Sequence, residues 1–90
     1  MSNQVTYSQN SNIFSKKING AWHILEPDQK IIQQLNPTSS FIWQLLKKPI
    51  SINQIVIKLQ QSYSVTQSKA LKDTNNLIKR LLKKNLIKKL

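Results

Sequence analysis

The sequence predicts an α+β fold in which a small antiparallel sheet of three strands is followed by three helices. Two observations indicate this order. The first third of the chain carries short strand-like runs separated by turn signals, whereas the rest carries apolar residues three or four positions apart. Strands followed by helices with short connections are typical of a domain whose helices lie on one side of the sheet.

Turn signals divide the first third of the chain into strands. Asn19-Gly20 separates NIFSKKI from AWHILE, and this dipeptide favours a two-residue hairpin because both positions tolerate a positive φ. Pro27-Asp28 is a second turn signal, and KIIQQL follows it. We expect strands at about residues 12–18, 21–26 and 30–35.

Capping residues indicate where the helices begin and end. Asn36 and Pro37 suit the N-cap and the first helical position, and Pro49 stops the helix that they start. Ser51 and Thr66 can cap a second and a third helix. We expect helices at about residues 37–47, 52–62 and 66–84. Because a tight turn joins the last two helices, we describe the predicted fold as winged-helix-like.

The third expected helix has two faces, and Asn85 can take the left-handed conformation that commonly ends a helix. Its expected core positions are Ala70, Leu71, Leu77, Ile78, Leu81 and Leu82. A basic stripe is expected on the other side, formed by Lys69, Lys72, Asn76, Lys79, Arg80 and Lys83. Such a stripe is either a solvated face or a surface for acidic groups.

The length of 90 residues corresponds to one domain. Residues 1–10 are polar and lack periodicity, so we expect a disordered N-terminal tail followed by a single domain over residues 11–90. No apolar run approaches the ~18 residues that a membrane span needs, and nothing resembles a signal peptide. The expected location is therefore the cytoplasm.

The side chains that carry chemistry are scarce. The chain has no cysteine and one histidine, His23, and its acidic residues are Glu26, Asp28 and Asp73. It also has no glycine-rich phosphate loop. We therefore expect a protein that is not an enzyme and that holds no metal ion or cofactor.

The net charge of +11 points to an acidic or polyanionic partner. Coding bias and solubility are the alternative explanation of the lysine surplus. Charge alone leaves nucleic acid, a membrane surface and an acidic peptide open as partners.

The third expected strand, Lys30 to Leu35, would be an edge of the sheet. Unpaired main-chain groups on an edge accept an incoming strand unless the edge is blocked, and KIIQQL has no proline and a single charge. Strand addition is a recurring mode of peptide recognition. The alternative is a short, inert edge.

Three stretches, LNPTSSFIWQLL, SINQIVIKLQQSYSV and LIKRLLKKNLI, resemble the PqqD-like family of small peptide-binding proteins. The resemblance runs from about Asn19 to Ile87. The N-P-T form is similar to stand-alone recognition proteins of lasso-peptide clusters. Two positions depart from the family pattern: Lys48-Pro49 replaces Asp-Gly, and Asn85 replaces glycine.

The resemblance implies that the chain recognises the leader of a ribosomally synthesised, post-translationally modified peptide (RiPP). The leader would add to the third strand, lie against the third helix and be presented to a maturation enzyme such as a leader peptidase or a radical-type maturase. Acidic leaders with apolar anchors would suit the lysine surplus. The residues expected to bind the leader are Lys30, Ile31, Ile32, Gln33, Gln34, Leu35, Leu71, Lys72, Asn75, Asn76, Lys79, Arg80 and Lys83.

Other functions compete with leader recognition. A winged helix that binds DNA would use the net charge, although the third helix offers a single arginine, the usual base reader. A basic module on anionic membranes is the weakest alternative. The exposed edge strand also allows two copies to form a dimer.

Overall fold

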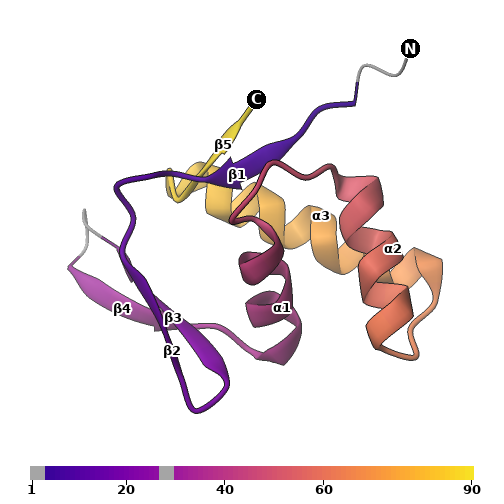
Figure 1. Ribbon diagram of the computed structural model, residues 1–90, viewed down its shortest axis with the longest axis horizontal. Coiled ribbons are helices and arrows are strands. Elements are labelled where there is room, and N and C mark those ends of the chain that lie inside the picture. The colour runs from indigo at the N-terminus through magenta and orange to yellow at the C-terminus, as the bar shows by residue number, and fades with distance from the viewer. Residues whose placement is uncertain (1–3, 27–29) are drawn as a thin grey trace.

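The computed structural model describes residues 4–26 and 30–90, in which a sheet lies on one side and helices lie on the other (Figure 1). The sheet consists of β2 (Ser15–Ile18), β3 (Ala21–Glu26) and β4 (Ile31–Gln34), hydrogen-bonded in that order. The helices are α1 (Pro37–Leu45), α2 (Ile52–Ser62) and α3 (Gln67–Lys83). A separate pair of strands is formed by β1 (Tyr7–Gln9) and β5 (Ile87–Lys89). The predicted α+β order is confirmed.

The hairpin of β2 and β3 has the turn that Asn19-Gly20 predicts. Asn19 has a φ of 51° and Gly20 a φ of 83°, so both residues take the positive values that a tight hairpin turn needs. The strand β2 is shorter than the expected 12–18 segment, although Phe14 C=O still accepts a hydrogen bond from Leu25 N–H at 3.0 Å. The predicted Pro27-Asp28 turn lies outside the described residues.

Polar side chains cap the N-termini of α1 and α2, and a residue in the left-handed conformation follows the end of α3. Asn36 Oδ1 accepts a hydrogen bond from Ser39 N–H at 2.8 Å. Ser51 and Gln54 form a reciprocal capping box at the start of α2. Asn85 has a φ of 58°, as predicted, so the chain turns sharply from α3 towards β5.

The expected disordered tail is wrong for residues 7–9, which form β1. This strand pairs antiparallel with β5, and Tyr7 also exchanges main-chain hydrogen bonds with Ile50. Gln9 Nε2 donates to Trp43 C=O at 2.7 Å, and Asn10 Nδ2 donates to Asn85 C=O at 2.6 Å. These contacts are long-range and mostly through the main chain, so they leave no periodic apolar pattern in the sequence.

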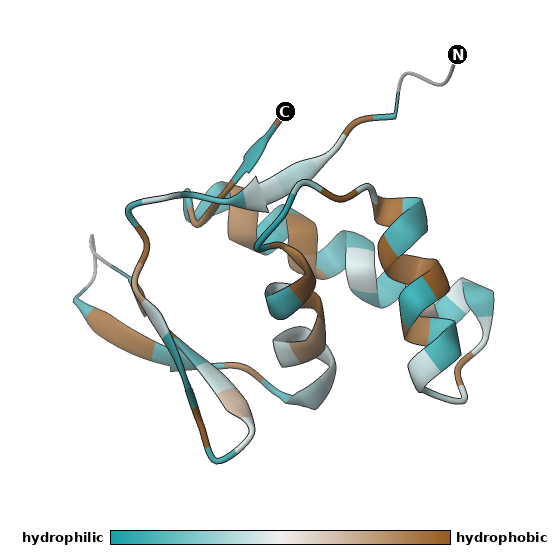
Figure 2. Ribbon diagram, in the orientation of Figure 1, coloured by the Kyte–Doolittle hydropathy of each residue, from teal (hydrophilic) through white to brown (hydrophobic). Residues whose placement is uncertain are grey.

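The core lies between the sheet and the helices. Trp43 is fully buried, and its indole N–H donates to Ser15 Oγ at 3.1 Å, which ties α1 to β2. Apolar segments of α1, α2 and α3 turn towards one another in Figure 2. The fully buried apolar side chains include Ile24, Ile42, Trp43, Leu46, Ile55, Leu81 and Leu86. This packing fixes the position of β4 relative to α3.

The buried face of α3 is largely the one that the sequence predicts: Ala70, Leu77, Ile78 and Leu81 are buried, and Leu82 packs against the core. Leu71 was expected in the core but is 40% exposed, whereas Thr74 is completely buried. The buried residues of α3 are Ala70, Thr74, Leu77, Ile78 and Leu81. The expectation is wrong for Leu71, and it omitted Thr74 because a threonine carries a polar hydroxyl. No helix in residues 4–26 and 30–90 has both the length and the apolar character that crossing a bilayer requires.

Candidate functional site

One edge of β4 is open. β4 pairs with β3 along one side, and no strand within residues 4–26 and 30–90 pairs with the other. Leu35 N–H donates to Trp22 C=O at 2.9 Å, so Leu35 directs its main chain at β3. Every second residue of an antiparallel strand does the same. The N–H and C=O groups of Ile32 and Gln34 therefore point outward from the open edge.

The side chains of β4 alternate between two faces of the sheet. Ile31, Gln33 and Leu35 lie on the face that the helices cover, and Leu35 is part of the core. Ile32 and Gln34 lie on the outer face, where the Ile32 side chain is 69% exposed. A strand added to this edge would consequently place alternate side chains towards the helices and towards solvent.

The end of α3 is tied to this sheet through Lys84. Lys84 Nζ lies 3.2 Å from Glu26 Oε2 and 3.4 Å from Gln33 Oε1. The Glu26 side chain is almost completely buried, so the ion pair is partly shielded from water. Because Lys84 reaches both β3 and β4, the same flank of α3 faces the region beside the open edge.

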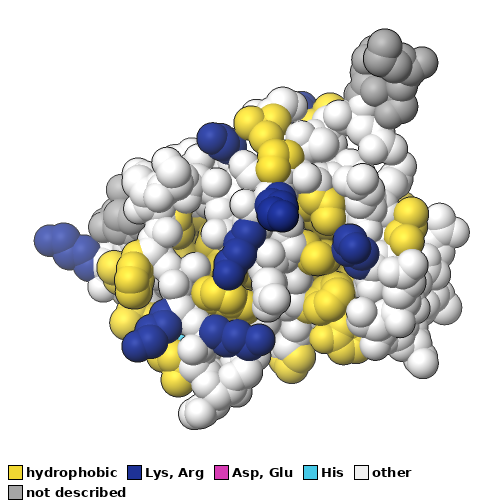
Figure 3. Space-filling view, viewed as in Figure 1, with side chains coloured by type: hydrophobic (Ala, Val, Ile, Leu, Met, Phe, Trp, Pro, Cys, Tyr) yellow, Lys and Arg dark blue, Asp and Glu magenta, His cyan; other side chains and the backbone are white. Residues whose placement is uncertain are grey.

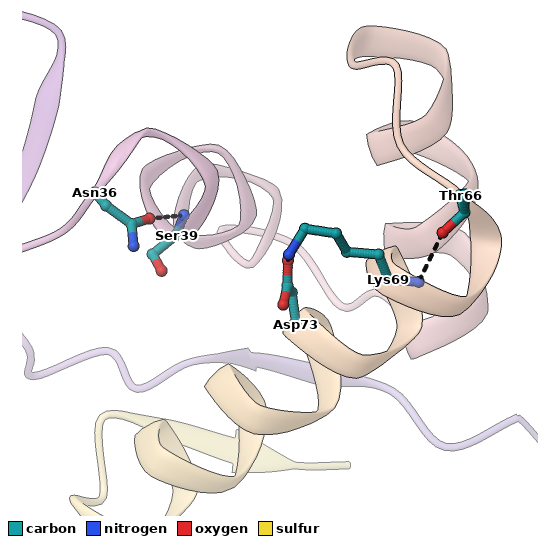
Figure 4. A network of polar contacts seen from close by, with 5 residues as sticks. All are labelled: Asn36, Ser39, Thr66, Lys69 and Asp73. Atoms are coloured by element: carbon teal, nitrogen blue, oxygen red, sulfur yellow. Dashed lines mark hydrogen bonds and ion pairs between the residues drawn. The ribbon is translucent and has the colours of Figure 1, made fainter.

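A hollow of about 460 Å³ opens between α1, α2 and α3, next to the end of β4. Its lining includes Asn36, Ser39, Leu59, Tyr63, Asn76 and Arg80. Figure 4 shows the caps of α1 and α3 on opposite sides of this region. Thr66 Oγ1 accepts from Lys69 N–H at 3.1 Å, and the Lys69 ammonium pairs with Asp73 at 3.2 Å. The hollow thus has a buried apolar floor and a polar rim.

The structure brings together some of the predicted binding residues. Asn76 and Arg80 line the hollow, and Gln33 contacts Lys84. Lys30 N–H donates to Glu26 C=O at 2.8 Å, so Lys30 belongs to the turn before β4 rather than to the strand.

Other predicted residues lie elsewhere on α3. At 100° per residue, Lys72, Lys79 and Lys83 project about 60–100° around the helix axis from Arg80, away from the buried side. Leu71 and Asn75 lie about 140–180° from Arg80, on the opposite flank from the hollow. The predicted basic stripe is therefore divided between solvent and the space between the Arg80 flank of α3, with its hollow, and the open edge of β4, which we call the groove.

Sequence reasoning missed several residues of this site. Asn36 was identified only as a cap and Ser39 was not singled out, yet both line the hollow. Asp73 also lines it, and Lys84 joins α3 to the sheet. For Asp73 the sequence did offer a signal: its i, i+4 spacing from Lys69 places the two side chains on one flank of the helix.

A family model matches residues 21–87, from the first residue of β3 to the first residue of β5. This model describes Coenzyme PQQ synthesis protein D (PqqD). The chain belongs to the PqqD family. No curated protein matches it in sequence.

The PqqD-family fold of this chain also occurs in a solved structure, TbiB1 in complex with the TbiA(beta) leader peptide. The two chains share 22% sequence identity with a TM-score of 0.80. The match covers 90% of this chain and 94% of the other. At this identity the likeness establishes the common fold.

Positive side chains are spread over the surface of this PqqD-family chain. Figure 3 shows Lys and Arg side chains across one face, with no acidic side chain among them. Of the three acidic residues in the sequence, Glu26 and Asp73 are in ion pairs, and Asp28 lies outside the described residues. Among the described residues, no group of three or more His, Cys, Asp or Glu could hold a metal ion.

Proposed function

We propose that this chain binds the leader peptide of a RiPP precursor by adding it as a strand to the open edge of β4. The observation that carries the proposal is the outward direction of the Ile32 and Gln34 main-chain groups beside the flank of α3 that holds Arg80. Strand addition takes its affinity from main-chain hydrogen bonds and its specificity from alternate side chains. Membership of the PqqD family and the fold shared with a leader-bound protein support this assignment.

We further propose that the bound precursor is presented to a maturation enzyme and that the chain itself catalyses no step. The outer face of the sheet supports a protein partner. Phe14, Leu25 and Ile32 lie side by side across the strands, and all three side chains are exposed. This apolar row adjoins the edge where the leader would lie, so an enzyme docked there could contact both. Because a RiPP precursor is made on the ribosome, we propose that this occurs in the cytoplasm.

Proline at position 32 tests strand addition. The Ile32 N–H points away from β3, so Ile32→Pro removes a donor from the open edge without removing a ladder bond of the sheet. We expect the variant to fold and to lose measurable affinity for the leader encoded beside the gene, by calorimetric titration. Ile32→Ala keeps the N–H and is the matched control, with affinity reduced only by its lost side-chain contacts. Unchanged leader affinity in a folded Ile32→Pro variant would contradict strand addition.

The outer apolar row gives a second prediction. Phe14 is 64% exposed and lies on the sheet face away from the helices, so Phe14→Ser should leave leader affinity unchanged. It should weaken binding to the maturation enzyme encoded with the precursor by about tenfold, as loss of an aromatic anchor commonly does. Ile57→Ser is the control, since Ile57 is similarly exposed and belongs to α2, a different element from the sheet. Equal effects of the two substitutions on enzyme binding would argue against this surface.

DNA binding is the second candidate, and one observation favours it. Lys72, Lys79 and Lys83 project together from the exposed flank of α3, where a recognition helix would meet phosphates. Duplex binding that is tighter than leader binding, with an affinity that falls linearly with salt on logarithmic scales, would favour this candidate. A dimer formed through β4 would occupy the same edge as the leader, so leader binding should compete with dimerisation.

A further inference from the structure

Three cationic side chains lie on the flank of α3 that faces the groove, and two of them already have acidic partners. Lys69 pairs with Asp73 at 3.2 Å. Lys84 pairs with Glu26 at 3.2 Å. Each ammonium is held near a carboxylate of the same chain, so neither has its full charge available to a ligand.

Arg80 is the third cation of this flank. It lines the hollow together with Asn36 and Asn76, and its side chain makes no ion pair with the acidic groups that the structure describes. A guanidinium offers five donors in a planar fork that matches a carboxylate. Arg80 is therefore the groove-facing cation best placed to take a carboxylate from outside.

The contact of Lys84 with Gln33 and the hollow that Arg80 shares with Asn36 place Arg80 near the end of β4. Arg80 precedes Lys84 by four residues, which is about 6 Å along a helix. Leu35 follows Gln33 by two residues, which is about 6.6 Å along a strand. Arg80 shares the hollow with Asn36, the residue after Leu35. The step from Lys84 to Arg80 along α3 and the step from Gln33 to Leu35 along β4 therefore run in the same direction. Because Asn36 directly follows Leu35, Arg80 lies near the end of β4.

An added strand has a defined set of side chains that point into the groove. Its residue paired with Gln34 shares the outer face of the sheet with the Gln34 side chain. Its residues opposite Ile31, Gln33 and Leu35 point towards the helices instead. The first of these meets the half-exposed apolar side chain of Ile31, and the last lies nearest the hollow that Arg80 lines.

We propose that Arg80 selects leader peptides that carry an Asp or Glu at one fixed place, opposite Leu35. The inference rests on the proposed strand addition and adds a sequence rule to it. The selected acid and an apolar residue opposite Ile31 are separated by four positions in the peptide, in an order set by the direction of the added strand. Lys72 and Lys79 do not contribute to this preference because they project about 80–100° around the helix from Arg80.

The probe is a displayed library of random dodecapeptides, selected separately against the wild-type chain, Arg80→Gln and Lys79→Gln. We expect wild type and Lys79→Gln to enrich peptides with an acid four positions from an apolar residue. Arg80→Gln should enrich the apolar residue without the acid. Both substitutions remove one positive charge from an exposed position of α3, so a difference between them reports position and not net charge.

A synthetic peptide from the wild-type selection completes the test. Replacing its acid by the matching amide should lower affinity for the wild-type chain by about tenfold, as loss of a charge-assisted hydrogen bond does, and should not change affinity for Arg80→Gln. An equal loss in both chains, or the same acid preference after selection on Arg80→Gln, overturns the role of Arg80 while leaving strand addition intact. If no chain enriches any peptide, the proposed function fails together with the inference.

Discussion

At the scale of single residues, Thr74 shows how one polar group can mislead a reading of the sequence. Its side chain is completely buried at the centre of the core face of α3, and its hydroxyl has no hydrogen-bond partner within the described residues. A buried hydroxyl without a partner costs about 1–3 kcal/mol. This face of α3 is nevertheless buried, because burying the apolar side chains around Thr74 stabilises the fold by more than the unpaired hydroxyl costs.

Thr74→Val removes that hydroxyl and keeps the shape of the side chain. We expect the free energy of unfolding to rise by about 1 kcal/mol, measured by urea denaturation with an unchanged slope. Thr66→Val is the matched control, since the Thr66 hydroxyl accepts a hydrogen bond from Lys69 N–H at the start of the same helix. The control should lower the free energy of unfolding by about 1 kcal/mol. A destabilised Thr74→Val variant would mean that the hydroxyl is satisfied in solution.

At the scale of elements, the sequence correctly predicted the turns and helix caps that depend on neighbouring residues. The Asn19-Gly20 turn and the Asn36 cap form where the sequence places them, because each depends on residues within a few positions. β1 was missed because it exists through pairing with β5, at the far end of the chain. A three-residue strand has too few side chains to show alternation, and its partner is invisible to a local pattern.

The candidate site divides in the same way. The open edge of β4 could be predicted from the order of the strands, and the structure adds which main-chain groups point outward. The helical half was predicted only in part: Asn76 and Arg80 line the hollow, but Lys72, Lys79 and Lys83 do not. The structure places Arg80 and Asn76 at the hollow, whereas Leu71 is 40% exposed and lies outside the core.

At the scale of the whole molecule, the dominant property is the net charge of +11. The described acidic residues pair with only two lysines, Lys69 and Lys84. Most of the lysine charge is therefore not neutralised by the chain itself and can act on a ligand. Such a field attracts an acidic peptide over distances of about a Debye length, roughly 10 Å at 0.1 M salt. The hydrogen bonds of an added strand act at contact, and salt affects them little. The association rate of the leader should therefore depend strongly on ionic strength, and its dissociation rate should depend on it only weakly.

The corresponding experiment measures leader association and dissociation rates as salt is raised from about 0.05 to about 0.5 M. We expect the association rate to fall by about tenfold, because screening removes electrostatic steering, and the dissociation rate to change by less than about twofold. Arg80→Gln should raise the dissociation rate at every salt concentration, because it removes a contact made in the bound state. Lys79→Gln should lower only the association rate. If salt instead acts mainly on dissociation, the complex is held by dispersed charge, and strand addition to β4 is not its main source of affinity.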